Sequence, residues 1–355
     1  MIGGLFGAST ASPGRSLRLR WGTEKPEDIT TLIRLCAAAF LALIAAPTAA
    51  LAQDWPQAGK PVRIVNPFPP GGTADGLSRA IAARLSPEIG VPVVVENKPG
   101  ATTMVAVNEL RKSPPDGHTI LYTITSTTSQ LPNLVSPPPF DIGRDFTPLG
   151  LLAFNALVLV ANPKAPFASV AELIAYAKAH PGKLNYGSFG TASNPHIMGE
   201  LLNKAAGIQM THIAYKGSAE SARAVISGEV DLAFDSPVTA INNRRAGLVK
   251  ALAIAGPRRL PVIGDVPTMA EAGIAGFETP GVEELLGPAG MKRPLADKMN
   301  ATLMRVVRSP EVSALYINNG FQLVASTVDE HARLMQENMK AWGEVIRRAG
   351  IKLEQ

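Results

Sequence analysis

Residues 62–85, VRIVNPFPPGGTADGLSRAIAARL, decide the fold class because they change from a strand pattern to a helix pattern across one short loop. The first four residues form a mostly apolar, β-branched run that is typical of a buried strand. From Ala74 to Leu85, apolar residues recur at the spacing of a helix. The loop between them is rich in proline and glycine, which end regular elements. This strand–loop–helix unit indicates an α/β protein.

The same alternation continues along the chain. Strand patterns at 92–96 and 119–124 enclose a helix pattern at 103–112, which favours a mainly parallel sheet covered by helices. A second α/β set follows, with expected strands at 184–187, 211–215, 230–234 and 249–254 and expected helices at 168–179, 194–206 and 218–227. The last expected elements are helices at 294–308, 310–318 and 328–349 and a short strand at 321–325.

The length of 355 residues favours two domains, since one domain usually takes about 100–200 residues. A long apolar stretch, residues 146–160, is interpreted as a strand that leaves the first α/β set and enters the second. Residues 276–290, dense in glycine and proline, would carry the chain back. We therefore predict a discontinuous lobe 1 (53–152 and 277–355), a lobe 2 (153–276), and two crossover segments that act as a hinge.

The N-terminus has the pattern of a secretory signal. Arg34 precedes an apolar run, and Ala50-Leu51-Ala52 is a small-residue cleavage site. The run is shorter than the roughly 20 residues of a spanning helix, although a single membrane anchor is the alternative. We predict that residues 1–52 are a signal peptide with an N-terminal extension, cleaved near Ala52. The only cysteine, Cys36, lies within it, so the mature chain suits an oxidising compartment.

Composition and motifs argue against several function classes. A net charge of +5 and an aromatic content of 5% predict no strong field or stacking platform for nucleic acid. The chain lacks a P-loop, a dinucleotide fingerprint, H-E-x-x-H and G-x-S-x-G. Its histidines have no companions at metal-ligand spacing. We therefore expect no catalytic residue, no metal and no cofactor.

Two loops have the chemistry of an anion site. Gly71 and Gly72 lie between a strand and a helix, and they allow a ligand to approach the backbone closely. The free N–H groups of the helix that follows favour a carboxylate. Residues 186–194, YGSFGTASN, have the same position in the second set and offer small hydroxyl donors. Two such helix starts facing each other would form an anion clamp, whereas the alternative is a pair of plain turns.

These loops and several later segments resemble the Bug family, the receptors of tripartite tricarboxylate transporters. The matching segments keep the order of the family from about residue 55 to the C-terminus: PFPPGGTAD (67–75), ENKPGA (96–101), PDGHTI (115–120), DFTPL (145–149), AYKG (214–217), GEVDL (228–232), PTMAEAG (267–273) and PAG (288–290). The resemblance implies a two-lobed periplasmic-binding-protein fold (Venus flytrap, type II). It also implies a monomeric periplasmic receptor that delivers a small carboxylate to the membrane permease of such a transporter.

The resemblance also implies which residues bind the ligand. They come from both strand–helix loops and from the ends of two further strands: Phe68, Gly71, Gly72, Thr73, Asp75, Ser126, Thr127, Ser188, Gly190, Thr191, Ser193, His196 and Asp235. Two of these have open alternatives. Asp75 either binds an amine of the ligand or holds its own loop, and we favour the second. His196 either faces the ligand or caps its helix.

One segment departs from the family pattern. Residues 282–284, Val-Glu-Glu, replace a Trp-x-Gly segment that often precedes Pro-Ala-Gly in the family. Two carboxylates near the cleft would repel an anion unless they point to solvent or meet an amine, so the class of ligand stays open. The alternative functions are a ligand-sensing receptor for a signalling partner and an exported hydrolase.

Overall fold

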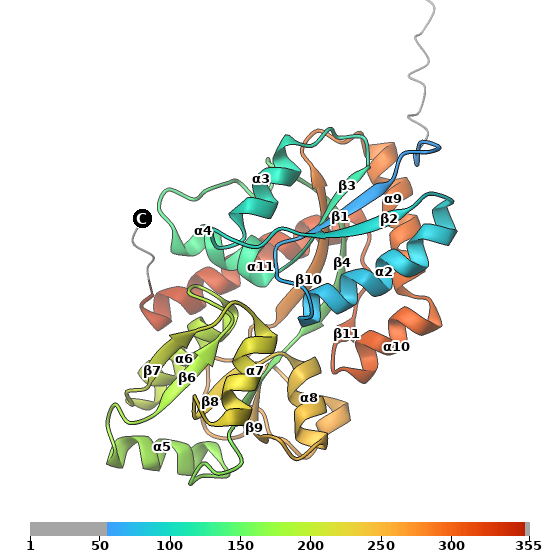
Figure 1. Cartoon of the computed structure of the whole chain (residues 1–355). Helices are drawn as coiled ribbons and strands as arrows, with labels where there is room; N and C mark the ends of the chain where they lie inside the picture. Colours follow the sequence, from blue (N-terminus) through green and yellow to red (C-terminus); the bar gives the residue numbers. More distant parts are fainter. Residues whose placement is uncertain (1–54, 352–355) are drawn as a thin grey trace, which may run out of the picture. The chain divides into compact units, whose positions relative to one another are not determined.

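The computed structural model describes residues 55–351, so the expected signal peptide at 1–52 lies outside the described residues. The described chain contains two sheets (Figure 1). The first has the strand order β11-β4-β10-β3-β1-β2 and consists of β1 (Val62–Asn66), β2 (Val93–Asn97), β3 (Thr119–Ile124), β4 (Phe146–Asn155), β10 (Gly281–Pro288) and β11 (Gln322–Leu323). The second has the order β7-β6-β8-β5-β9 and consists of β5 (Leu157–Ala161), β6 (Asn185–Ser188), β7 (Thr211–Ala214), β8 (Leu232–Asp235) and β9 (Lys250–Ala255).

Helices cover both sheets, and each sheet with its helices is called a lobe below. Lobe 1 contains α2 (Thr73–Ile89), α3 (Met104–Lys112), a π-helix (Ser126–Gln130), α4 (Leu131–Leu134), α9 (Arg293–Val307) and α10 (Pro310–Asn318). Lobe 2 contains α5 (Val170–Ala179), α6 (Asn194–Ala206), α7 (Ser218–Ser227), α8 (Pro237–Arg245) and a 3₁₀ turn (Pro261–Ile263). The last helix, α11 (Val328–Ala349), contacts β4 of lobe 1 and α6 of lobe 2.

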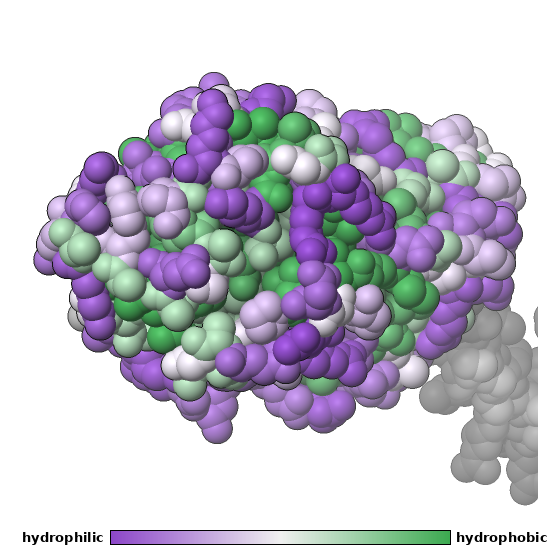
Figure 2. Space-filling model, turned by 90° about the horizontal axis from the view of Figure 1, so that it is seen from below, coloured by the Kyte–Doolittle hydropathy of each residue, from purple (hydrophilic) through white to green (hydrophobic). Residues whose placement is uncertain are grey.

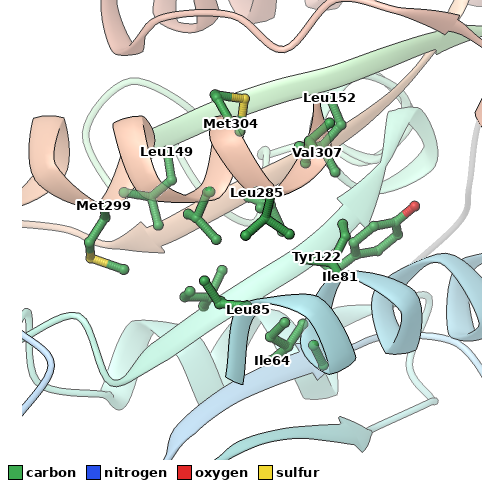
Figure 3. Close-up of a cluster of buried hydrophobic side chains, with 14 of the residues drawn as sticks. Ile64, Ile81, Leu85, Tyr122, Leu149, Leu152, Leu285, Met299, Met304 and Val307 are labelled. Atoms are coloured by element: carbon green, nitrogen blue, oxygen red, sulfur yellow. The ribbon is translucent and has the colours of Figure 1, made fainter. Parts of the chain in front are cut away.

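The core of lobe 1 follows the two-residue period of its strands. Ile64 and Tyr122 pack with α2 and α9, as Figure 3 shows, whereas their neighbours Val65 and Leu121 pack on the opposite face with α3 and α11. Burial on both faces explains why these strands are apolar almost throughout. Lobe 2 is built alike, with α5 and α6 on one face of its sheet and α7 and α8 on the other.

The three strands from which a parallel sheet was expected, β1, β2 and β3, pair in parallel, but both complete sheets are mixed. β10 runs antiparallel to both β3 and β4, and β5 runs antiparallel to both β8 and β9. The reason lies in the crossovers. β5 and β10 each enter their sheet from the other lobe, at the end of the sheet where the βα loops lie. They are therefore antiparallel to the strands that these loops follow.

The first crossover lies within the stretch 146–160, which was expected to be one continuous strand but forms two strands, one in each sheet. β4 ends at Asn155 and β5 begins at Leu157, so Ala156 alone separates the two sheets. The chain returns through β10, whose eight residues are all buried. Its glycines and proline lie near its ends, and the central Val-Glu-Glu-Leu-Leu forms a strand in the middle of the sheet. The sequence pattern pointed only to a connection here.

Figure 2 shows hydrophilic and hydrophobic residues interspersed on the face seen from below, without one continuous apolar surface. Among residues 55–351, no helix combines the length and the hydropathy that crossing a bilayer requires.

The core of lobe 1 gives a first prediction. Leu85 is fully buried between α2 and the sheet, so Leu85→Ala leaves a cavity and lowers the free energy of unfolding by about 2–5 kcal/mol. The matched control is Val105→Ala on α3, whose side chain is 44% exposed and whose loss changes that free energy by about 0.5 kcal/mol or less. Chemical denaturation measures both, and equal losses would contradict this packing.

Candidate functional site

Five helices begin at one cavity of about 240 Å³ between the lobes. The residues at their starts line it: Gly72 and Thr73 (α2), Thr125 and Ser126 (π-helix), Ser193 and Asn194 (α6), Gly217 and Ser218 (α7), and Ser236 and Pro237 (α8). These starts follow the carboxyl ends of β1, β3, β6, β7 and β8. Ligands of open α/β sheets bind at this end of the strands, because the βα loops gather there.

The helix starts give the cavity a positive electrostatic potential. Each helix N-terminus carries the equivalent of roughly half a positive charge on its free N–H groups. In the described part of the chain, no side chain accepts a hydrogen bond from the first-turn amides of α2, α6 or α7. Their N-cap residues are Gly72, Gly217 and Ser193, and the Ser193 hydroxyl instead donates to Gly190 O at 2.6 Å. These amides are therefore available to an anionic ligand.

One cationic side chain reinforces this potential. Arg223 of α7 lines the cavity together with Glu220 of the same helix. The Glu220 carboxylate accepts a hydrogen bond from the backbone amide of Lys216 at 3.2 Å, so it holds the loop before α7. Buried Asn194 adds a polar group whose Oδ1 has no hydrogen-bond partner within residues 55–351.

The first loop is held from behind by Asp75. Its carboxylate accepts hydrogen bonds from the Gly71 amide at 3.0 Å, from Arg79 Nε at 3.0 Å and from Asn97 Nδ2 at 2.9 Å. Burial raises the pKa of Asp75, but these three donors together outweigh burial and hold its pKa below the ordinary value. Asp75 does not line the cavity, and its contacts agree with the expectation that it orders its own loop.

The second loop is held by bonds within itself. The Ser188 hydroxyl accepts from the Gly190 amide at 3.1 Å and donates to Gly190 O at 3.0 Å. The Ala192 amide donates to His196 Nδ1 at 3.1 Å, so this ring holds the loop residue that precedes the N-cap Ser193 and leaves the first-turn amides of α6 free of a side-chain cap. His196 also stacks on His212, with ring centroids 4.0 Å apart. These contacts fix the direction in which α6 approaches the cavity.

Ser188 and His212 are close enough to suggest a nucleophile and its base, at 2.6 Å between Oγ and Nε2. The Ser188 hydroxyl is also hydrogen-bonded to the backbone N–H and C=O of Gly190, at 3.1 and 3.0 Å. Burial, aided by His196, lowers the pKa of His212 to about 4. Ser188 is fully buried and does not line the cavity, so the pair has a structural role.

The two lobes touch across the cavity. Thr73 Oγ1 and Ser236 Oγ lie 2.7 Å apart and form a hydrogen bond between α2 and the start of α8. Gly217 packs on Pro69 so closely that a Cβ there would lie 3.2 Å from the proline Cγ. A Cβ on Gly72 would lie 3.3 Å from Ser218 Oγ. Glycine at these two positions allows the loops to meet, and the cavity is thereby largely closed.

The rest of the wall is apolar apart from one polar group. The apolar residues are Phe68, Ile124, Leu157, Phe189 and Phe321. The polar group consists of Asn155, at the end of β4, and Glu283 of β10. Asn155 Nδ2 donates to Glu283 Oε1 at 2.9 Å, and Tyr122 Oη donates to Glu283 Oε2 at 2.6 Å.

Of the two adjacent carboxyl groups noted in the sequence, one reaches the cavity. Successive side chains of a strand point to opposite faces, so Glu284 points away from Glu283. Glu284 Oε2 lies 2.8 Å from His331 Nε2, and its other oxygen accepts from Thr128 of the π-helix. The Gly150 amide donates to His331 Nδ1, so the Nε2 proton of His331 is donated to Glu284. Of the two carboxyl groups, only Glu283 is therefore placed where it could repel an anionic ligand.

Comparison with known proteins agrees with this geometry. A family model described as "Tripartite tricarboxylate transporter family receptor" matches residues 77–351. The chain belongs to this family. BugT of Bordetella pertussis is 30% identical over 312 residues, which cover 88% of this chain and 94% of BugT.

Two solved structures show the fold of this receptor family with ligands present. One is Rpa4515 of R. palustris with adipate (TM-score 0.79, 31% identity, 84% of this chain and 99% of that one). The other is MatC from Rhodopseudomonas palustris with bound malate (TM-score 0.77, 30% identity, 82% and 100%). The predicted two-lobed periplasmic-binding-protein fold and the predicted family are thus confirmed, and the chain is a solute-binding receptor.

The structure brings together six of the residues expected to bind the ligand in this receptor. Those that line the cavity are Phe68, Gly71, Gly72, Thr73, Ser126 and Ser193. Those that lie outside its lining are Asp75, Thr127, Ser188, Gly190, Thr191, His196 and Asp235. Asp235 is buried behind α8 and accepts from the Ser236 amide and from Thr239, each at 2.7 Å. Direct ligand contact by these residues stays a prediction.

Sequence reasoning missed the starts of α7 and α8. Ser218 and Ser236 line the cavity with Arg223, and Pro237 is the first residue of α8. A Ser-Pro pair directly after a strand is a helix-start signal, so α8 could have been found. Asn155 and Glu283 carried no such signal, because strand pairing rather than a loop brings them to the cavity.

A second prediction concerns the support of the first loop. Asp75→Asn removes a buried charge that accepts three hydrogen bonds, so it lowers the free energy of unfolding at pH 7 by about 1–3 kcal/mol. The pKa of Asp75 is lower in the folded state than in the unfolded state. The ionised carboxylate therefore stabilises the fold fully above the unfolded pKa, and this stabilisation is lost as the pH falls through the folded pKa.

Chemical denaturation at pH 7 and at pH 3 measures this pH dependence. The free energies of unfolding of wild type and Asp75→Asn are closer to each other at pH 3 than at pH 7. The control is Asp265→Asn, an exposed partner of Arg244 with a side chain that is 68% exposed, for which the change in the free energy of unfolding at pH 7 is much smaller because solvent screens the ion pair. If Asp75→Asn lowers the free energy of unfolding at pH 7 no more than Asp265→Asn does, the Asp75 carboxylate does not order the loop.

Proposed function

We propose that this receptor captures a small dicarboxylate in the cavity between its lobes. In this proposal the chain is exported by a signal peptide cleaved near Ala52, works in the periplasm and delivers its ligand to the permease of a tripartite tricarboxylate transporter. The observation that carries the proposal is the convergence of uncapped helix starts. The free amides of α2, α6 and α7, together with Arg223, favour an anion in a cavity that is otherwise mostly apolar.

The size and walls of the cavity support a ligand of this class. About 240 Å³ suits a small organic molecule, and the apolar residues around it suit a short carbon chain between two charged ends. Two similar receptors have been solved with adipate and with malate, and both ligands carry two carboxylates. Backbone amides supply hydrogen bonds without a dense cluster of cationic side chains.

Binding without catalysis is part of the proposal. The family and the similar solved structures are binding proteins, and the Ser188–His212 pair is occupied with structural hydrogen bonds. Closure of the lobes through the Thr73–Ser236 contact would bring α2 and α8 into one surface. A permease could distinguish the loaded from the empty receptor by that surface.

The first loop gives the test. Purified mature protein gains thermal stability with adipate or malate, by about 2.7 kcal/mol at a ligand concentration of 100 times Kd. Gly72→Asp places a carboxylate among the amides at the start of α2, where only 3.3 Å separates a Cβ from Ser218 Oγ, and it abolishes the stabilisation. Gly72 has a φ of −87°, so the backbone accepts the change.

The matched control is Gly76→Asp, which adds the same charge to the same helix at an exposed position with open space around it. The control retains the stabilisation by ligand. If Gly72→Asp binds as wild type does, the start of α2 is not part of the site. If no carboxylate stabilises the wild type, the proposed function is wrong.

A further inference from the structure

Glu283 is the one acidic side chain on the lobe 1 wall of the cavity within the described residues. The residue is only 4% exposed, and its place at the cavity is fixed by pairing of β10 with β3 and β4. Tyr122 Oη and Asn155 Nδ2 each donate a hydrogen bond to it, at 2.6 and 2.9 Å. The Asn155 amide nitrogen can only donate, whereas the Tyr122 hydroxyl can donate to the carboxylate form of Glu283 or accept from its protonated form.

No cationic side chain pairs with Glu283 within residues 55–351, where every ion pair closer than 4.0 Å involves other carboxylates. The titratable groups on the elements around it are Tyr122 (β3), Tyr316 (α10), Glu284 (β10), Glu220 and Arg223 (α7) and Asp235 (β8). Burial, aided by the charge of Glu284, raises the pKa of Glu283 to about 8 although the hydrogen bonds from Tyr122 and Asn155 lower it. At neutral pH the carboxyl group is therefore mostly protonated.

We propose that Glu283 is a specificity-determining residue whose protonated carboxyl group donates a hydrogen bond to one carboxylate of the ligand, while the helix starts bind the other. This inference rests on the proposed function and adds the residue that forms a hydrogen bond with the second carboxylate of the ligand. A ligand carboxylate supplies a charged acceptor to a buried acid whose hydrogen-bond partners in the protein are the phenol of Tyr122 and the amide nitrogen of Asn155.

The same contact explains how an anion receptor tolerates a buried glutamate in its site. An ionised carboxylate beside a ligand carboxylate costs free energy, whereas a carboxylic acid donating to a carboxylate forms a charge-assisted hydrogen bond. The site then selects for a ligand with an acceptor at this end and against one with an ammonium group there. Binding becomes linked to the proton on Glu283.

The sign of this linkage follows from the free receptor. Below a pH of about 8 the acid is already protonated, so ligand affinity does not change with pH. Above this pH, binding requires the uptake of one proton, and Kd rises about tenfold for each pH unit.

The test is calorimetry from pH 6.5 to 9.5 with adipate and with malate. Wild type shows a constant Kd up to about pH 8, then a rise of about tenfold per unit with uptake of about one proton, measured in buffers of different ionisation enthalpy. Glu283→Gln keeps a neutral donor of the same shape. Its Kd at pH 6.5 is higher than that of wild type, because the amide nitrogen cannot accept the hydrogen bond that one of the two oxygens of Glu283 receives, but this Kd stays flat to pH 9.5.

A second variant separates Glu283 from the other buried acid near the cavity. Burial raises the pKa of Asp235 to about 7, but this carboxylate bonds within lobe 2 to Ser236 and Thr239. In Asp235→Asn, Kd therefore rises with pH above pH 8 as steeply as in wild type. Circular dichroism and the melting curve of each variant show that it is folded.

Three results would overturn the inference. The first two concern the rise of Kd with pH above pH 8: Glu283→Gln shows the same rise as wild type, or Asp235→Asn loses it instead. The third is an affinity that increases with pH, because an ionised Glu283 then meets an ammonium group of the ligand. Binding of adipate or malate without any pH dependence rejects the role of Glu283 and leaves the proposed function intact. A receptor that binds no carboxylate at any pH rejects both.

Discussion

Free backbone amides at helix starts need hydrogen-bond acceptors, and this need governs the cleft of the receptor. α2, α6 and α7 begin without a side-chain cap among the described residues, and all three point their first turns at one cavity. In a globular protein such groups are satisfied by water or by a ligand. Because the potential comes from the backbone, the site favours an anion while its side chains remain small and mostly apolar.

The architecture serves this arrangement. Parallel strands bring the βα loops of each lobe to one end, and the antiparallel strands β4, β5 and β10 connect the two ends that face each other. Only Ala156 separates β4 from β5, so the two sheets are joined directly beside the cavity. Few dihedral angles need to change for the lobes to open and close. The Thr73–Ser236 hydrogen bond joins the two lobes in this structure.

The sequence predicted what local patterns encode. The helices at 194–206, 310–318 and 328–349 begin and end where expected, and the first loop lies at the cavity. Prediction failed where long-range pairing decides. β10 contains two adjacent glutamates between glycines and proline, and only its partners β3 and β4 make it a central strand that presents Glu283 to the cavity and Glu284 to His331. No local period encodes that difference.

In the proposals made above, specificity and affinity come from different parts of the receptor. The helix starts supply general attraction for an anion, and the β10 wall supplies one polar group at the other end. The most direct measurement is a crystal structure of the mature receptor with adipate. Our account predicts one carboxylate within about 3.2 Å of first-turn amides of α2 and of a lobe 2 helix. Adipate bound elsewhere, or held in this cavity without contact to those amides, would contradict it.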